Sequence, residues 1–423
     1  MGLSYDEAYY WVYSQFLSWG YFDHPPMVAA LIKMGYSIFP NEFGVRFFFN
    51  ILSVSTLWLL WDLSTKKNKF LFICLSLSLP LVQSAGILAL PDTPLLFFSV
   101  LFLWTTNRYL KEESVLNIFL VSLSIACMFY SKYHGLLIVL LTVMAVPHLL
   151  KKKSFWIIAA TSAFLFLPHM YWQYLNDFVS FKFHLTGRAE KHFELANILN
   201  YITSQLVLFG MGFFVWFCFI IKKINRKDYF ERILIFNVLG FLIFLFFVSF
   251  RNQVEANWTV SACACFLILM ERLIPQYEKR KLILALTIFP ALLFLSLRLI
   301  LSLPSSFYEG QNIGRLNEIK NWEKRIEMFR DIVGDSTVVS ETYQYGAKFS
   351  FELKKIIPVK HFRGRDSHYS LLNLTKNINK DEPIYYLTPN KQKNAVIIET
   401  DYKDPIFIIK TTLRELEEKH NDN

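Results

Sequence analysis

The chain is organised around residues 6–26, which read DEAYYWVYSQFLSWGYFDHPP and precede a long series of apolar segments. This stretch begins with two adjacent carboxylates, Asp6 and Glu7, and ends with the pair Asp23-His24 before two prolines. Aromatic residues fill the interval between the two pairs. Ionisable groups beside membrane segments are usually functional, so this stretch is the first candidate for a site.

The first part of this stretch has the signals of a helix start. Ser4 and Glu7 have the spacing of a capping box, and aromatic residues then recur at three- and four-residue intervals. Tyr and Trp favour the headgroup region of a bilayer, which predicts a helix lying along the membrane surface. Capping and the helix dipole explain Glu7 adequately. They do not explain the Asp23-His24 pair, whose direction the following prolines fix through an extended backbone.

The composition is that of a polytopic membrane protein. Of the 423 residues, 54% are hydrophobic and 17% aromatic, which is more than a soluble multidomain chain carries. A net charge of +10 would suit nucleic acid, but the Lys and Arg residues form short clusters between apolar runs, so we expect no nucleic-acid partner. The five cysteines all lie inside apolar runs and form neither a disulfide nor a zinc framework.

Ten apolar runs are long enough, or nearly long enough, to span a bilayer. They cover about 43–63, 70–90, 93–110, 115–131, 135–150, 154–173, 197–221, 232–250, 257–274 and 281–303. Alternate connections hold seventeen and five Lys or Arg residues, and the positive-inside rule makes the richer set cytoplasmic. The sequence thus predicts a multi-pass protein of the cell inner membrane.

This orientation puts residues 1–41 and the tail after Leu303 on the outer face. We expect three parts: an outer-face loop with the interfacial helix (1–41), a bundle of about ten transmembrane helices (42–303) and a small extracytoplasmic α/β domain (304–423). An N-terminal segment on the outer face needs a preceding segment that exports it. We therefore expect one more transmembrane helix ahead of Met1, or a start that was assigned too late.

Most of the candidate site residues fall on the same outer face. Each has an ordinary explanation: Asp92 suits a helix start, and Lys132 and His134 suit a helix end. The loop from residue 176 to residue 192 could be a solvated connection, and Arg251 could satisfy Glu255. The shared sidedness of these residues is stronger evidence for a site than any one of them.

The sequence of the final domain, residues 304–423, predicts four short strands and three helices. The strands are expected at 336–340, 383–388, 395–400 and 405–410, and the helices at 317–333, 342–354 and 411–419. The polar segment Arg363–Tyr369 is interpreted as a plain surface turn.

Residues 4 to about 303 resemble bacterial glycosyltransferase family 39, which are GT-C membrane enzymes similar to protein O-mannosyltransferases and the lipid A aminoarabinose transferase. The resemblance lies in the motifs DEAYYW (6–11), GYFDHPP (20–26), LPDTP (90–94), YSKYHG (130–135), FKFH (181–184) with GR (187–188), and VEANW (254–258). It implies transfer of a hexose or pentose from a polyprenyl-phosphate donor on the outer face. The family's acidic pair maps onto Asp6 and Glu7, and its second outer Asp maps onto Asp92. One branch has Glu-Lys-Pro in place of Asp23-His24-Pro25.

This chemistry assigns roles to the candidates. We expect Asp6 to act as the base that activates an acceptor hydroxyl in an inverting displacement, with Glu7 and Asp92 also catalytic. The donor phosphate is expected to contact His24, Lys132, Lys182 and Arg188. Substrate is expected to contact Asp23, Tyr9, Tyr10, Tyr133, His134, His184, Glu255 and Asn257.

Two alternatives stay open. Asp23, His24 and Asp92 could instead gather a divalent metal on the phosphate, which would be the cofactor. A transporter or flippase of lipid-linked sugars would also hold charged residues near helices, although such folds often show internal repeats, and none is seen here. The partners expected are the lipid donor, membrane lipids and an acceptor that is protein, lipid or glycan.

Overall fold

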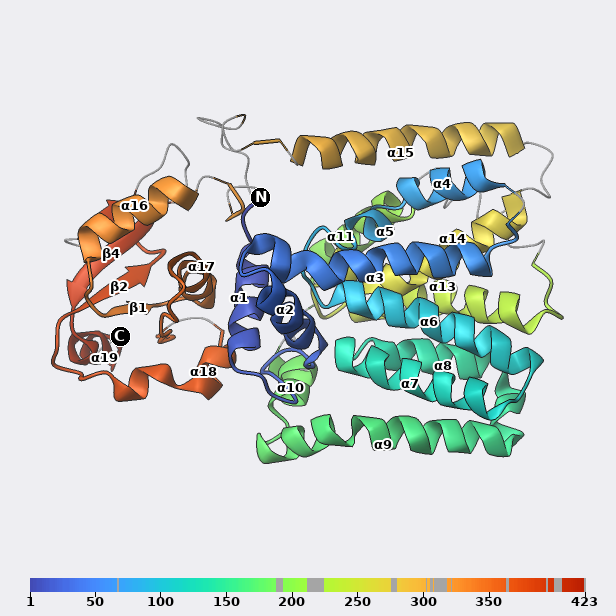
Figure 1. Ribbon diagram of the computed structural model, residues 1–423, viewed down its shortest axis with the longest axis horizontal. Coiled ribbons are helices and arrows are strands. Elements are labelled where there is room, and N and C mark those ends of the chain that lie inside the picture. The colour runs from blue at the N-terminus through green and yellow to red at the C-terminus, as the bar shows by residue number, and fades with distance from the viewer. Residues whose placement is uncertain are drawn as a thin grey trace. The chain divides into compact units, whose positions relative to one another are not determined.

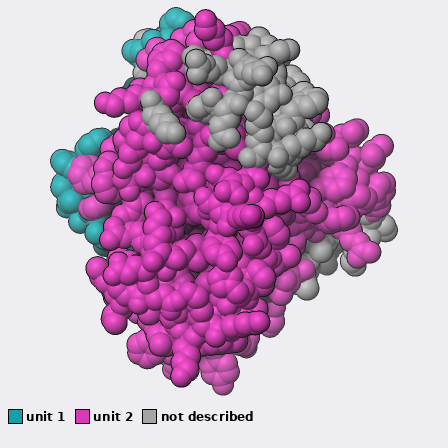
Figure 2. All heavy atoms as spheres, turned by 90° about the vertical axis from the view of Figure 1, so that its right-hand side faces the viewer, with its two compact units in different colours: residues 1–23, 29–45, 302–423 teal, residues 24–28, 46–301 magenta. Residues whose placement is uncertain are grey.

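The computed structural model separates the chain into two compact units. One contains residues 1–23, 29–45 and 302–423 and is called the sheet unit; the other contains residues 24–28 and 46–301 and is called the helical unit. Figure 2 colours the two units separately. The structure describes residues 1–66, 68–187, 193–210, 224–274, 280–301, 303–304, 307, 318–320, 322–362, 365–392, 395–398 and 405–421.

The helical unit is built from helices that run side by side (Figure 1). Each of the ten predicted spans contains helix, although the run at 197–221 is described only as far as residue 210. The run at 70–90 is broken at Pro80, which has no N–H for the helix and occupies the first position of the next one. In order the helices are α3 (Glu42–Leu63), α4 (Lys69–Ser78), α5 (Pro80–Ser84), α6 (Asp92–Lys111), α7 (Val115–Ser131), α8 (Gly135–Ala145), η1 (Pro147–Lys151), α9 (Lys153–Leu175), α10 (Val179–Lys182), η2 (Phe183–Gly187), α11 (Leu195–Leu208), α13 (Tyr229–Val248), η4 (Ala256–Thr259), α14 (Val260–Leu273) and α15 (Arg280–Leu301).

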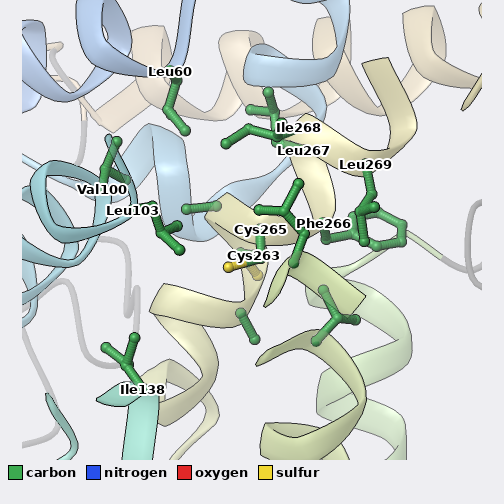
Figure 3. Close-up of a cluster of buried hydrophobic side chains, with 14 of the residues drawn as sticks. Leu60, Val100, Leu103, Ile138, Cys263, Cys265, Phe266, Leu267, Ile268 and Leu269 are labelled. Carbon is green, nitrogen blue, oxygen red and sulfur yellow. The ribbon is translucent and has the colours of Figure 1, made fainter. Parts of the chain in front are cut away.

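Helix α14 is the core of the helical unit. Every residue from Val260 to Glu271 is buried, as expected for a helix that is apolar on all sides. Its side chains belong to one hydrophobic cluster with Leu60 of α3, Leu103 of α6 and Ile138 of α8, part of which Figure 3 shows. The described cysteines are all free, and two of them lie in this core, in agreement with the sequence.

Other helices of this unit carry apolar side chains on their outer surface. Among the described residues, helices α3, α9 and α13 are long and apolar enough to cross a membrane. Large side chains such as Phe164, Tyr171 and Phe247 are exposed, which would be costly in water and is ordinary in lipid.

Charged residues lie at both ends of the bundle. At one end, the last turn of α14 meets the end of α3, where Glu271 accepts a hydrogen bond from the Thr65 backbone N–H at 2.8 Å. At the other end, the start of α6, the end of α7 and the start of η4 come together around Asp92. The predicted site residues of these segments therefore gather at the end opposite Glu271.

The sheet unit contains a four-stranded sheet in the order β1-β2-β4-β3. Strands β1 and β2 are parallel, whereas β4 pairs antiparallel with β2 and β3. Strands β1, β2 and β3 fall within the segments that the sequence predicted, and β4 extends one residue beyond its predicted segment, to Thr411. The elements are α1 (Tyr5–Gln15), α2 (Met27–Ile38, in this unit from residue 29), α16 (Trp322–Val333), β1 (Val338–Ser340), α17 (Tyr343–Leu353), α18 (His368–Leu372), η8 (Leu374–Asn377), β2 (Ile384–Thr388), β3 (Val396–Ile398), β4 (Ile406–Thr411) and α19 (Leu413–Asn421).

Helix α1 packs on α17 inside this unit and is not a one-sided surface helix. Residues Glu7 to Ser14 are all buried, which requires protein on every face of the helix. Trp11 meets the rings of Tyr36 and Phe351, and Tyr5 meets Trp322. The aromatic residues that suggested a bilayer interface are used for packing between helices instead.

Candidate active site

The start of α1 places Asp6 and Glu7 in different environments. Glu7 is fully buried and completes the predicted capping box, since its carboxylate accepts a hydrogen bond from the Ser4 backbone N–H at 2.9 Å. Asp6, one position earlier, is exposed. Among the described residues, the Asp6 carboxylate makes no hydrogen bond and no ion pair.

Asp6 reaches solvent, but protein atoms surround it closely. Burial raises the pKa of Asp6 to about 6, because the charged carboxylate loses hydration. Repulsion from Asp23 and Glu318 adds to this rise, and attraction by Arg365 opposes it. A carboxylate with such a pKa is still ionised near neutral pH and accepts a proton more readily than an ordinary Asp.

Asp23 is buried and held on both oxygens. One oxygen accepts a hydrogen bond from the Tyr13 hydroxyl, and the other forms an ion pair with Arg365 at 3.0 Å. The Tyr13 ring stacks on Tyr21 at 4.1 Å between centroids, which fixes the hydroxyl. Asp23 is therefore a fixed charge that supports α1 and influences Asp6.

The segment from Arg365 to Tyr369 is not the plain surface turn that the sequence suggested. His368 and Tyr369 are buried, and the His368 backbone N–H donates to the Tyr9 hydroxyl at 2.6 Å. The His368 ring lies edge-on to Tyr13, and burial lowers the pKa of this histidine to about 4, so it is neutral. Polar residues in a loop suggested exposure, but their partners come from α1, more than three hundred residues earlier.

In the helical unit, Asp92 is also held on both oxygens. Lys132 binds one at 2.9 Å and the Asn257 amide donates to the other at 2.9 Å. The N-cap of α6 is Pro91, with no side-chain cap, so the Asp92 side chain does not serve as a helix cap. The structure thus brings together three predicted residues from three separate motifs.

A second polar cluster lies near the end of α9. The Tyr133 hydroxyl meets His169 Nε2 at 3.0 Å and accepts from the Gln173 amide at 2.9 Å. The His184 ring lies 5.4 Å from the Tyr133 ring and 6.3 Å from the ring of His24. Sequence reasoning missed His169 and Gln173, although two polar residues one helical turn apart inside an apolar run are a detectable signal.

The other predicted residues are placed as follows. Tyr9 and Tyr10 are buried against each other and against Tyr13. His134 lies over Trp258, with 4.8 Å between ring centroids. Lys182 and Glu255 are exposed, and Arg188 lies outside the described residues. Within the described part of the chain, no three His, Cys, Asp or Glu side chains are grouped to hold a metal ion.

Comparisons with known proteins agree with this architecture. Residues 23–172 match the family described as dolichyl-phosphate-mannose-protein mannosyltransferase. The lipid A galacturonosyltransferase RgtD of Rhizobium johnstonii is 24% identical over 302 residues, which cover 67% of this chain and 63% of that protein. The chain therefore matches less than two thirds of the length of this relative.

Solved structures share the fold over almost the whole chain. ArnT from Cupriavidus metallidurans in the apo state superposes with a TM-score of 0.68 at 10% identity, covering 98% of this chain and 94% of ArnT. ArnT bound to undecaprenyl phosphate gives 0.66 at 10% identity, with 96% and 92% covered. These matches confirm the predicted fold class, a helical membrane protein with a small α/β domain.

Proposed function

We propose that this chain is a GT-C-type membrane glycosyltransferase that moves a sugar from a polyprenyl-phosphate-linked donor to an acceptor hydroxyl. The observation that carries the proposal is the fold shared with ArnT, whose solved complex contains undecaprenyl phosphate. The matches to RgtD and to the mannosyltransferase family support the same reaction class. The fold and the exposed apolar helices make it an integral membrane protein.

Asp6 is the best candidate for the base. An acceptor hydroxyl is a poor nucleophile, and a base must be open to the acceptor and have a pKa close to the working pH. Asp6 is exposed and its pKa is about 6. Glu7, Asp23 and Asp92 have their carboxylates bound by neighbouring donors, so we assign them to positioning.

The proposed step is a single displacement. The acceptor oxygen forms a bond to the anomeric carbon while its proton passes to Asp6, and the bond from that carbon to the phosphate oxygen breaks. The polyprenyl phosphate leaves with the electron pair, and the anomeric centre is inverted. Cations stabilise the departing phosphate. Lys182, His24 and Arg188 are the proposed cations, and Lys132, which forms an ion pair with Asp92, is assigned to positioning that carboxylate.

A divalent metal on the donor phosphate is a further part of the proposal. Transfer measured before and after chelation decides whether a metal is needed.

The membrane orientation is another part of the proposal. We propose that the Asp92 end of the bundle and the sheet unit face outwards from the inner membrane. Single cysteines at 151–153 should then resist an impermeant thiol reagent in intact cells, and their labelling would reverse the orientation.

The test of the function is covalent transfer. Membranes containing the chain are incubated with a labelled polyprenyl-phosphate sugar, and products are separated and weighed by mass spectrometry. We expect a labelled product that requires the chain and is lost in Asp6→Asn. A flippase would move the labelled donor across the bilayer and form no new glycosidic bond, and that outcome would replace the proposal.

A further inference from the structure

The sheet unit holds a pocket of about 330 Å³ that the proposed transfer does not use. It is lined by Glu341 directly after β1, Tyr386 of β2, the segment after β2, Phe362 and the last turns of α19. Strands β1 and β2 are parallel, so the pocket lies at their carboxyl ends, where α/β sheets usually bind ligands.

This pocket and α1 lie on opposite faces of the sheet. Phe349 of α17 packs with Leu387 and Ile408 on one face, and α17 carries α1. The neighbouring residues Tyr386 and Ile409 point to the other face, where they pack with Leu416 of α19. The pocket is therefore separate from Asp6 and its surroundings.

A fixed carboxylate lies in the pocket. Glu341 directly follows β1 and is 6% exposed, and its backbone N–H donates to Leu387 at 2.8 Å. The Thr388 hydroxyl donates to one of its carboxylate oxygens and accepts from the Asn390 backbone N–H at 3.1 Å. Among the described residues, hydrogen bonds reach only one of the two oxygens, which leaves the other able to accept from a ligand.

The rest of the lining combines rings, amides and cations. Phe362 lies 6.0 Å from the Tyr386 ring and 5.7 Å from the His420 ring, so three rings form an aromatic wall. Asn390 and Gln392 add amide donors and acceptors, and Lys391 and Lys419 add positive charge. The volume is at the small end for ligand pockets and suits a single ring.

We propose that this pocket binds a sugar ring that carries an acidic group. The carboxylate and the amides match pairs of ring hydroxyls, which both donate and accept. The aromatic wall covers the apolar face of the ring. Lys391 and Lys419 pair with a carboxylate or phosphate substituent.

The test measures binding to the full-length protein in detergent by ligand-observed NMR titration. The probes are glucuronic acid, glucose, inorganic phosphate and adenosine monophosphate. We expect glucuronic acid to bind most tightly and glucose more weakly. Removing both lysines (Lys391→Ala with Lys419→Ala) should weaken glucuronic acid about tenfold and leave glucose unchanged. Lys410→Ala, an exposed lysine of β4 outside the pocket, is the matched control.

A second pair of variants tests the buried group. Glu341→Gln keeps an acceptor for Thr388 but loses the charge that binds ring hydroxyls, so it should weaken the neutral sugar glucose. Asn390→Ala, at an exposed position, should weaken both sugars. Unchanged binding in the lysine variant and in Asn390→Ala would overturn the proposal. Equal competition by phosphate or adenosine monophosphate would also overturn it, in favour of a general anion or nucleotide site. Because binding is measured, this result is independent of the proposed transfer.

Discussion

Asp6 in the sheet unit and Asp92 in the helical unit both lie in the first turn of a helix, but their surroundings differ. Asp92 is almost buried, and Lys132 and Asn257 occupy its two oxygens. Asp6 is exposed, and no described residue donates to it. A paired carboxylate holds three segments together, whereas an unpaired one with a raised pKa remains able to accept a proton.

The comparison explains why sequence alone could not separate the two. Both residues lie in motifs of the resemblance, and both have the spacing of a helix start. The difference arises from partners that are distant in the chain, and it divides the acidic candidates into one proposed base and several positioning groups. The following experiments test that division.

The largest effect is expected for Asp6→Asn. Asn keeps the shape and a hydrogen-bonding group but cannot take the acceptor proton, so transfer should fall by about 10²–10⁴-fold while the protein remains folded. The rate is measured with a labelled polyprenyl-phosphate sugar. Glu7→Gln is the matched control, because Gln also completes a capping box, and it should be damaged less. Equal and mild losses in the two variants would remove Asp6 as the base.

The next effect is a loss of stability in Lys132→Met. This change leaves the Asp92 charge nearly buried without its cation, which costs about 3–5 kcal/mol of unfolding free energy. Thermal unfolding in detergent measures it, and Lys111→Ala, an exposed lysine at the other end of α6, is the control. Adding Asp92→Asn to Lys132→Met should recover most of the stability. No recovery would mean that Asp92 acts through more than this pair.

A smaller effect is expected for Arg365→Ala. The variant loses a charge-assisted hydrogen bond to Asp23, which at this partly exposed arginine should cost about 1–2 kcal/mol of unfolding free energy, and it should lower the transfer rate by loosening the support of α1. Arg365 also lowers the pKa of Asp6, so its removal should move the acid limb of the rate profile to higher pH. Arg365→Lys keeps the charge and should recover part of both effects. A lower rate with an unmoved limb would leave Arg365 a structural role only.

The smallest effect is expected for Lys182→Ala. This lysine is exposed, so the loss of its contact with the donor phosphate should raise the apparent KM for the donor about tenfold with little change in kcat. Steady-state kinetics with varied donor measure it. Kinetics identical to those of the unaltered protein would make the α10 segment an ordinary solvated connection.

Much of the architecture followed from local patterns. Apolar runs predicted the helices of the bundle, and alternation with turn residues predicted the four strands. The sequence placed Asp92, Lys132 and Asn257 on the same side of the bundle, but it did not predict that Lys132 and Asn257 bind the two oxygens of Asp92. The sequence did not predict the Arg365–Asp23 pair or the burial of His368, because loop residues and distant helices have no spacing that links them. The aromatic face of α1 was assigned to lipid, since a protein surface and a bilayer interface favour the same residues.

The most direct test of the central claim is the pH dependence of kcat/KM for transfer. Protonated Asp6 cannot accept the acceptor proton, so the rate should rise with pH and level off above a pKa of about 6. Asp23→Asn removes a repelling charge and should move this limb to lower pH. A profile with no acid limb near pH 6, or a limb that Asp23→Asn leaves in place, would contradict Asp6 as the base.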